Sequence, residues 1–296
     1  MKLAAIDCGS NAVRLLISNV FEVGDWKPFI RKADLYRVPV RLGEDAFVRG
    51  IISKERAKAL IHTMIAFKEL MNACGVDDYM ACATSAMRTA KNGPDLVKQV
   101  RREVGLEIEI IDGSKEAELI ALNRLDGRFL IGNFLYIDVG GGSTELSLYQ
   151  DGLLMASRSF KIGTIRIKEG LVSPKRWTHM KQWIEEHCLT FPNLSAIGSG
   201  GNINKLFSLT NSKPDKPVSL KRIQLLHNDL SQLSIEERMV KLGLKPDRAD
   251  VIVPAGQIFT NIMQWSNIVQ IFVPRIGLSD GLIHALYRKK RPIKDD

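Results

Sequence analysis

Apolar and polar positions follow two periods along this chain of 296 residues. Short apolar runs at 3–7 and 13–20 have the length of strands and are separated by a turn. Over 54–73, apolar residues recur every three or four positions, which predicts an amphipathic helix with Ser53 as its N-cap and Gly75 as its stop. The apolar side of this helix is expected to carry Ala57, Leu60, Ile61, Met64, Ile65 and Met71.

Strands and helices continue to alternate toward the C-terminus. A capping box at Ser234 and Glu237 starts one helix. Pro254 is expected to interrupt or kink another helix, because proline lacks a backbone donor. The other predicted strands are 79–83, 107–111, 135–138, 145–149, 196–197 and 268–273, and the other predicted helices are 94–104, 174–188, 247–265 and 280–289. Alternation of this kind predicts an α/β protein.

One short phrase occurs twice in the chain. The first copy is an apolar strand that ends in Asp7, followed by Gly9 and Ser10 in a turn, and then a second strand. The second copy ends in Asp138 and has three consecutive glycines, 140–142, in its turn. A single copy would be no more than a β-hairpin with a glycine-rich turn. Two copies predict two similar half-molecules that face each other across a cleft.

The boundary between these halves is expected near residue 118, just before the second copy begins. The predicted domains are therefore 1–118 and 119–296. The last helix, at about 280–290, is expected to pack back on the first domain.

The repeated turn has the composition of a phosphate site. Glycine tolerates the backbone conformations of a tight turn and lets an anion approach the N–H groups closely. Asp7 and Asp138, each at the end of a strand, offer hard oxygen ligands for Mg²⁺ or another divalent cation. A P-loop is absent, because the chain contains no G-x-x-x-x-G-K-[ST].

Composition narrows the class of protein further. Apolar residues make up 45% of the chain, which is enough for two cores, and the net charge of +9 suits a polyanionic partner. No nucleic-acid motif accompanies this charge, and no run reaches the ~18 apolar residues of a membrane span. Four scattered cysteines without a C-x-x-C pair predict reduced thiols and a cytoplasmic protein with no zinc site. We expect neither nucleic-acid nor membrane binding, and a homodimer is left open.

Several ordered motifs resemble the exopolyphosphatase / guanosine-pentaphosphate phosphohydrolase family. They include both copies of the phrase and the later Gly163-Thr164-Ile165-Arg166 and Gly198-Ser199-Gly200-Gly201-Asn202 segments. They also include Arg41-Leu42-Gly43-Glu44, Ala83-Thr84-Ser85-Ala86-Met87-Arg88 and Ile110-Ile111-Asp112-Gly113-Ser114-Lys115-Glu116-Ala117. The resemblance covers essentially the whole chain. It implies a duplicated ribonuclease H-like fold, as in actin, heat-shock ATPases and sugar kinases, in a short two-domain form.

The resemblance also implies an activity and its residues. The expected reaction is Mg²⁺-assisted hydrolysis that removes terminal orthophosphate from inorganic polyphosphate. Glu116 matches the family's catalytic base, Glu145 its second catalytic carboxylate, and Asp7 and Asp138 the metal ligands. The expected phosphate-binding residues are Ser10, Asn11, Arg14, Arg41, Arg88, Gly141, Gly142, Ser143, Thr144 and Arg166, with Lys161 as a further candidate.

The sequence departs from the family's pattern at two places. Glu118 stands where arginine is usual, and Ser279-Asp280-Gly281 replaces the usual Arg-Glu-Gly. The rivals to the expected function are hydrolysis of guanosine pentaphosphate (pppGpp) in the same site, a sugar- or acetate-kinase-like phosphotransferase, and a non-catalytic sensor of polyphosphate or alarmone.

Overall fold

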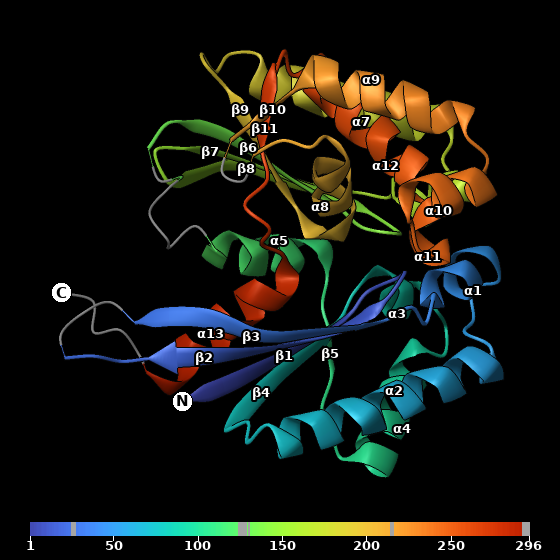
Figure 1. Cartoon of the computed structure of the whole chain (residues 1–296), viewed down its shortest axis with the longest axis vertical. Helices are drawn as coiled ribbons and strands as arrows, with labels where there is room; N and C mark the ends of the chain where they lie inside the picture. Colours follow the sequence, from blue (N-terminus) through green and yellow to red (C-terminus); the bar gives the residue numbers. More distant parts are fainter. Residues whose placement is uncertain (25–27, 124–128, 130, 214–215, 292–296) are drawn as a thin grey trace. The chain divides into compact units, whose positions relative to one another are not determined.

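A computed structural model describes residues 1–24, 28–123, 129, 131–213 and 216–291. The chain forms two compact units. Unit 1 consists of Met1–Asn123 with Leu278–Asp296, and unit 2 of Arg124–Gly277. Each unit contains one mixed sheet with helices packed on it (Figure 1), so the prediction of an α/β fold is confirmed.

Unit 1 is built on a five-stranded sheet of order β3-β2-β1-β4-β5. Its strands are β1 Lys2–Cys8, β2 Val13–Phe21, β3 Phe29–Val38, β4 Asp78–Ala83 and β5 Glu109–Ile110. The first three strands are antiparallel neighbours, and β4 runs parallel to both β1 and β5. The predicted strand pair near the N-terminus is therefore confirmed, whereas β5 is shorter than the predicted strand 107–111.

Helices cover both faces of this sheet (Figure 1). The unit contains α1 Leu42–Val48, α2 Lys54–Ala73, α3 Ser85–Thr89, α4 Gly93–Val104, α5 Gly113–Ala121 and α13 Leu278–Lys290. On one face, α13 packs on α5 and on β1 and β2, around Leu3, Ala5 and Leu16. A side chain at Gly281 would meet the Leu119 carbonyl at 2.0 Å, so only glycine allows α13 to approach α5 this closely.

The helix α2 has the predicted bounds and N-cap. The Ser53 side chain accepts a hydrogen bond from Arg56 N, as capping requires. The expected position of Ile65 on the apolar side is wrong, because Ile65 is 42% exposed. The buried stripe runs instead through Leu60, Met64 and Phe67, which follow the 3.6-residue period more closely.

Unit 2 is built on a six-stranded sheet of order β10-β11-β9-β6-β7-β8. Its strands are β6 Asn133–Val139, β7 Thr144–Gln150, β8 Leu153–Phe160, β9 Ser195–Ser199, β10 Val218–Ser219 and β11 Gln270–Phe272. Its helices are α6 Thr164–Lys168, α7 Pro174–Cys188, α8 Gly200–Leu209, α9 Leu220–Gln232, α10 Ile235–Leu242, α11 Pro246–Ala249 and α12 Ile252–Trp265. The antiparallel trio β6-β7-β8 repeats the arrangement of β1-β2-β3.

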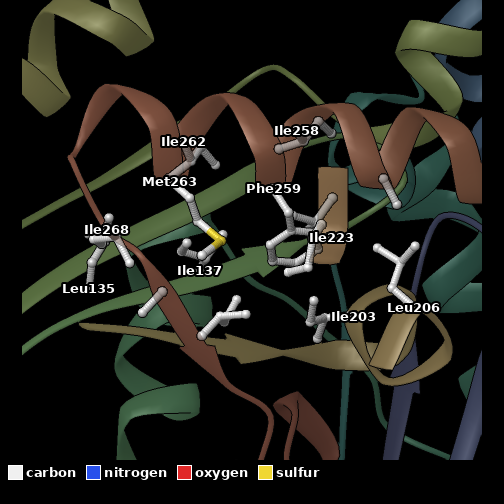
Figure 2. Close-up of a cluster of buried hydrophobic side chains, with 14 of the residues drawn as sticks. Leu135, Ile137, Ile203, Leu206, Ile223, Ile258, Phe259, Ile262, Met263 and Ile268 are labelled. Atoms are coloured by element: carbon white, nitrogen blue, oxygen red, sulfur yellow. The ribbon is translucent and has the colours of Figure 1, made fainter. Parts of the chain in front are cut away.

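The core of unit 2 lies between its sheet and α12 (Figure 2). Phe259 and Met263 point from α12 toward β6, which contributes Leu135 and Ile137. Ile203, from α8, joins the same cluster of fully buried side chains. This packing fixes β6, and therefore the start of the second glycine-rich turn.

The predicted helix over 247–265 is two helices, so the expected break at Pro254 is wrong in position. The chain leaves α11 after Ala249, whose carbonyl accepts a hydrogen bond from the buried Arg238 guanidinium instead of continuing a helix. Pro254 lies in the first turn of α12, where a missing backbone donor costs nothing.

Three smaller predictions concern caps, thiols and membrane segments. The capping box at Ser234 and Glu237 is present. All four cysteines are free thiols, as expected. Among the described residues, no helix is both long and apolar enough to span a membrane.

Candidate phosphate and metal site

The repeated phrase folds into two hairpins with the same backbone. In unit 1, Asp7 is opposite Arg14, and a four-residue turn follows Cys8. In unit 2, Asp138 is opposite Glu145 across a turn of the same length. Each turn is closed in the same way, since Gly9 N donates to Ala12 O at 3.2 Å and Gly140 N donates to Ser143 O at 2.9 Å.

Each hairpin lies within a row of four cross-strand neighbours. The unit 1 row is Cys82, Asp7, Arg14 and Arg37, from β4, β1, β2 and β3. The unit 2 row is Ser199, Asp138, Glu145 and Ser159, from β9, β6, β7 and β8. Side chains directly opposite one another point to the same face of a sheet and interact. The two rows therefore occupy equivalent positions, one in each unit, and carry side chains of different chemistry.

The unit 1 row combines one carboxylate with two guanidinium groups. Arg14 Nη1 lies 2.7 Å from Asp7 Oδ2, and the Asp7 side chain is 4% exposed. Arg37 is the cross-strand neighbour of Arg14. Burial, followed by the Asp7 charge, raises the pKa of the Cys82 thiol and of the neighbouring Cys8 thiol. Both thiols are therefore uncharged, and the guanidinium groups of the row are the kind that suits an anion.

The unit 2 row combines two carboxylates with two hydroxyl groups. Asp138 and Glu145 offer carboxylate oxygens within 4.8 Å of each other. Ser199 Oγ donates to Asp138 Oδ1 at 2.8 Å, and Ser159 Oγ donates to Glu145 Oε1 at 2.8 Å. Two hydrogen-bonded carboxylates at this separation are a hard-oxygen donor set, so these residues fit a divalent cation such as Mg²⁺.

Gly200 makes room for the Asp138 carboxylate. A Cβ at Gly200 would lie 2.6 Å from Asp138 Oδ1, and the φ of Gly200 is 84°, a conformation that favours glycine. The Gly198–Asn202 segment thus contributes to the site through its backbone and through Ser199.

The glycine-rich turn of unit 2 is held by the start of α6. The carbonyl of Gly140 accepts from Thr164 N at 3.0 Å, and that of Gly141 accepts from Ile165 N at 2.9 Å. The Gly142 carbonyl accepts from Arg166 Nε at 2.8 Å. The carbonyls of the three glycines are therefore directed toward α6.

The turn of unit 1 is held in a related way by the segment that leads into α1. Gly43 N donates to Ser10 O at 2.8 Å, and Arg41 N donates to Asn11 O at 3.0 Å. Arg41 has a φ of 57°, which is unusual for a residue with a side chain, and its guanidinium bonds to the Glu44 carboxylate. Ser10, Asn11 and Arg41 are thus brought together in unit 1.

Glu116 lies in the first turns of α5, in unit 1. The helix is capped by Asp112, whose side chain accepts from Lys115 N, and Glu116 is 7% exposed. Arg88 Nη1 lies 4.0 Å from Glu116 Oε2 and also bonds to the Ile111 carbonyl. The structure therefore places the expected base beside one of the expected phosphate-binding arginines.

The two departures from the family's pattern are both ion-paired within unit 1. Glu118 lies 2.9 Å from Lys115, and Asp280 lies 2.6 Å from Lys32. Their charges are therefore offset locally.

Sequence reasoning missed Arg37, Ser159 and Ser199 as members of the rows. It also did not anticipate that Arg166 is buried, with its Nε on the turn rather than in solvent. Lys161 is exposed. The signal for Ser199 was available, because it ends the strand that precedes a glycine-rich segment, as Asp138 does.

Comparison with known proteins decides the family. A model of the Ppx/GppA phosphatase family matches residues 34–290. The chain belongs to this family.

Relatives of the chain in the Ppx/GppA family include proteins with two different names. Exopolyphosphatase 1 of Mycobacterium tuberculosis is 28% identical, over 96% of this chain and 87% of that protein. A guanosine-5'-triphosphate,3'-diphosphate pyrophosphatase of Aeromonas salmonicida is 24% identical, over 96% of this chain and 59% of that protein. The crystal structure of an exopolyphosphatase from Cytophaga hutchinsonii matches with a TM-score of 0.83 at 23% identity, over 99% of both chains, which supports the fold.

Proposed function

We propose that the chain is a divalent-cation-dependent phosphohydrolase that releases terminal orthophosphate from inorganic polyphosphate. The observation that carries the proposal is the difference between the two rows. One row offers guanidinium groups suited to phosphoryl oxygens, and the other offers carboxylates suited to Mg²⁺. A polyphosphate chain with its bound cations presents the charges that both rows would recognise.

Within this proposal, Asp138 and Glu145 hold the cation, which supplies charge neutralisation at the phosphoryl group. Asp7 acts by holding the Arg14 guanidinium, because its Oδ2 already accepts from Arg14 at 2.7 Å. Arg14 and Arg88 bind phosphoryl oxygens. This interpretation revises the expectation that Asp7 and Asp138 are equivalent metal ligands.

The turns supply hydrogen-bond donors for the phosphate. The Thr144 hydroxyl, which was a predicted phosphate donor, is excluded because it already donates to the Ile162 carbonyl at 2.7 Å. In unit 2 the donors are the N–H groups of 141–143 and the Ser143 hydroxyl. In unit 1 they are the equivalent groups of Ser10 and Asn11, with Arg41 beside them. Cradles of backbone N–H groups bind anions without any further charge.

Glu116 is the proposed general base. Water attacks the terminal phosphorus, its proton passes to the Glu116 carboxylate, and the bond from the terminal phosphorus to the bridging oxygen breaks. The products are orthophosphate and a chain shorter by one unit. Arg88 Nη1 lies 4.0 Å from Glu116 Oε2, beside the carboxylate that would accept the proton.

Glu116→Gln is expected to bind polyphosphate normally and to lose turnover by roughly 10²–10⁴-fold. Phosphate release under single-turnover conditions measures this loss. Near-normal turnover in Glu116→Gln would remove the base assignment.

The alternative substrate is guanosine pentaphosphate, which the name of the Aeromonas salmonicida relative suggests. Phosphate release from short polyphosphate, long polyphosphate, guanosine pentaphosphate and ATP at equal concentration distinguishes the two. Preference for guanosine pentaphosphate would move the enzyme to alarmone metabolism. Tight binding of one of these ligands without release of phosphate would support a sensor instead.

A further inference from the structure

One side chain holds the glycine-rich turn of unit 2 in addition to the backbone. We propose that Arg166 is a positioning residue, which orients the N–H groups of 141–143 toward phosphate and does not itself bind the phosphate chain. The inference rests on the proposed function, because it assigns a phosphate to this turn. Arg166 is 8% exposed, and its Nε donates to the Gly142 carbonyl at 2.8 Å.

The orientation follows from the geometry of the peptide bond. In a trans peptide, the carbonyl of one residue and the N–H of the next point in opposite directions. The carbonyls of Gly140, Gly141 and Gly142 are all bonded to the first turn of α6. The N–H groups of Gly141, Gly142 and Ser143 are therefore directed away from α6 and together form a cradle for an anion. Arg166 fixes the last of these peptides, the one that carries the Ser143 N–H.

The turn needs this side chain because of its composition. Three consecutive glycines have more backbone freedom to lose on folding than any other sequence. The equivalent turn of unit 1 contains Ser10, Asn11 and Ala12, and its carbonyls are held by backbone N–H groups from Arg41 and Gly43. A flexible turn with the same geometry requires an additional anchor.

The register of the two units identifies Glu44 as the counterpart of Arg166. After β3, Val40 N donates to Val38 O, and after β8, Ile162 N donates to Phe160 O. Counting on from these matched turns places Glu44 and Arg166 at the same position. Glu44 pairs with the Arg41 and Arg56 guanidinium groups instead of reaching its turn. Of these two matched turns, the one with three consecutive glycines is therefore the one that receives the Arg166 anchor.

The segment that leads into α6 also packs tightly on the turn. A Cβ at Gly163, the residue before α6, would lie 2.5 Å from the Gly141 carbonyl oxygen and 2.6 Å from the carbonyl carbon of Gly142. The start of α6 is thus in direct contact with the turn. Arg166 follows Ile165 in the chain, and its guanidinium adds the hydrogen bond to the Gly142 carbonyl.

The test compares Arg166→Met and Arg166→Lys with Arg238→Met. Arg238 is a matched control, because it is 9% exposed and its Nε also donates to a carbonyl, that of Leu230, at 2.9 Å. For each variant we would measure KM and kcat with polyphosphate, the inhibition constant of orthophosphate, the affinity for Mn²⁺ and the melting temperature. Lysine keeps a donor at position 166 and is the variant more certain to fold.

A positioning role predicts that phosphate affinity falls while Mn²⁺ affinity does not change. In Arg166→Met, the polyphosphate KM and the orthophosphate inhibition constant are expected to rise by about tenfold to a hundredfold, while Mn²⁺ affinity stays unchanged. Arg166→Lys should fall between this variant and the wild type. Arg238→Met should lower the melting temperature and leave the polyphosphate KM and the orthophosphate inhibition constant unchanged.

Two results would overturn the inference. One is a change in the phosphate constants of Arg238→Met as large as that in Arg166→Met. The other is an unchanged phosphate affinity in a folded Arg166 variant. If the wild-type protein hydrolyses none of the substrates, the proposed function fails, and calorimetric titration with pyrophosphate still compares phosphate binding by Arg166→Lys and the wild type.

Discussion

The hairpins of unit 1 and unit 2 have the same backbone arrangement and carry side chains of different charge. Both have the same turn length, the same closing hydrogen bond and an Asp at the same position. Opposite that Asp, unit 1 has Arg14 and unit 2 has Glu145. In the next matched segment the charges are exchanged, with Glu44 in unit 1 and Arg166 in unit 2. The comparison teaches that the duplicated fold fixes positions, while single side chains decide whether a position suits an anion or a cation.

The surroundings of each Asp agree with that difference. Asp7 is neutralised by a guanidinium 2.7 Å away and has the Cys82 thiol beside it on β4. Asp138 has Ser199 at the position equivalent to Cys82, and the serine hydroxyl donates to the carboxylate. Hydrogen bonds from hydroxyl groups orient a carboxylate whose oxygens can still act as hard donors to a cation.

The largest effect should come from giving the unit 2 row the charges of the unit 1 row. Glu145→Arg places a guanidinium opposite Asp138, as Arg14 is opposite Asp7. We expect Mn²⁺ binding to be lost and polyphosphate hydrolysis to fall by roughly 10³-fold or more. The fold should be kept, because Asp138 gains the partner that Asp7 has. Retained Mn²⁺ affinity in a folded Glu145→Arg protein would contradict the assignment of the metal to this row.

A smaller effect is expected from a methyl group between α6 and the turn. Gly163→Ala would bring a Cβ within 2.5 Å of the Gly141 carbonyl, and overpacking of this kind costs about 1–3 kcal/mol. Part of that cost should appear as a shift of the turn, so the KM for polyphosphate should rise along with a loss of stability. Unfolding in urea and steady-state kinetics measure the two effects.

Gly256→Ala is the control for that substitution. Its Cβ would lie 2.7 Å from His227 Nδ1, an atom of a side chain that can move, and it lies between α12 and α9 in the core of unit 2. Equal effects of both alanines on KM at equal loss of stability would show that the clash acts through stability alone.

An effect of about the same size concerns the ion pair of unit 1. Arg14→Met leaves the buried Asp7 carboxylate without its guanidinium, which should lower the free energy of unfolding by about 1–3 kcal/mol and raise the polyphosphate KM. Adding Asp7→Asn should recover most of the stability, because the neutral amide needs no counter-charge, and should leave the KM high. Recovery of KM together with stability would mean that Arg14 supports the fold and does not bind substrate.

Much of this arrangement could be predicted from sequence, because its signals are local. The repeated phrase predicted both hairpins, and the glycines predicted tight turns. The positions of Glu116 and Arg88 followed from the family's motifs. Such features depend on residues that are close together in the chain.

The last members of the two rows, Arg37 on β3 and Ser159 on β8, could not be predicted. The position of each depends on a β-bulge. The register between β2 and β3 shifts between Ile17 and Ser18, where Ala33 is the extra residue. Counting back from the β2–β3 connection without this bulge would place Tyr36 opposite Arg14, instead of Arg37. One added residue reverses the face to which every later side chain points.

Unit 2 has a β-bulge at the matching position. The register between β7 and β8 shifts between Leu148 and Tyr149, which brings Ser159 opposite Glu145. A regular ladder would have placed Arg158 there. Nothing in the sequence of β8 marks Met155 as the extra residue, so the Ser159 hydrogen bond to Glu145 became evident only in the structure.

The central claim is that the carboxylates of unit 2 bind the divalent cation and that Asp7 does not. The most direct test is calorimetric titration of Mn²⁺ into the wild-type protein, Asp138→Asn and Asp7→Asn, each shown by its melting curve to be folded. The account predicts that Asp138→Asn loses Mn²⁺ binding and that Asp7→Asn keeps the wild-type affinity. Loss of Mn²⁺ binding in Asp7→Asn with normal binding in Asp138→Asn would contradict it.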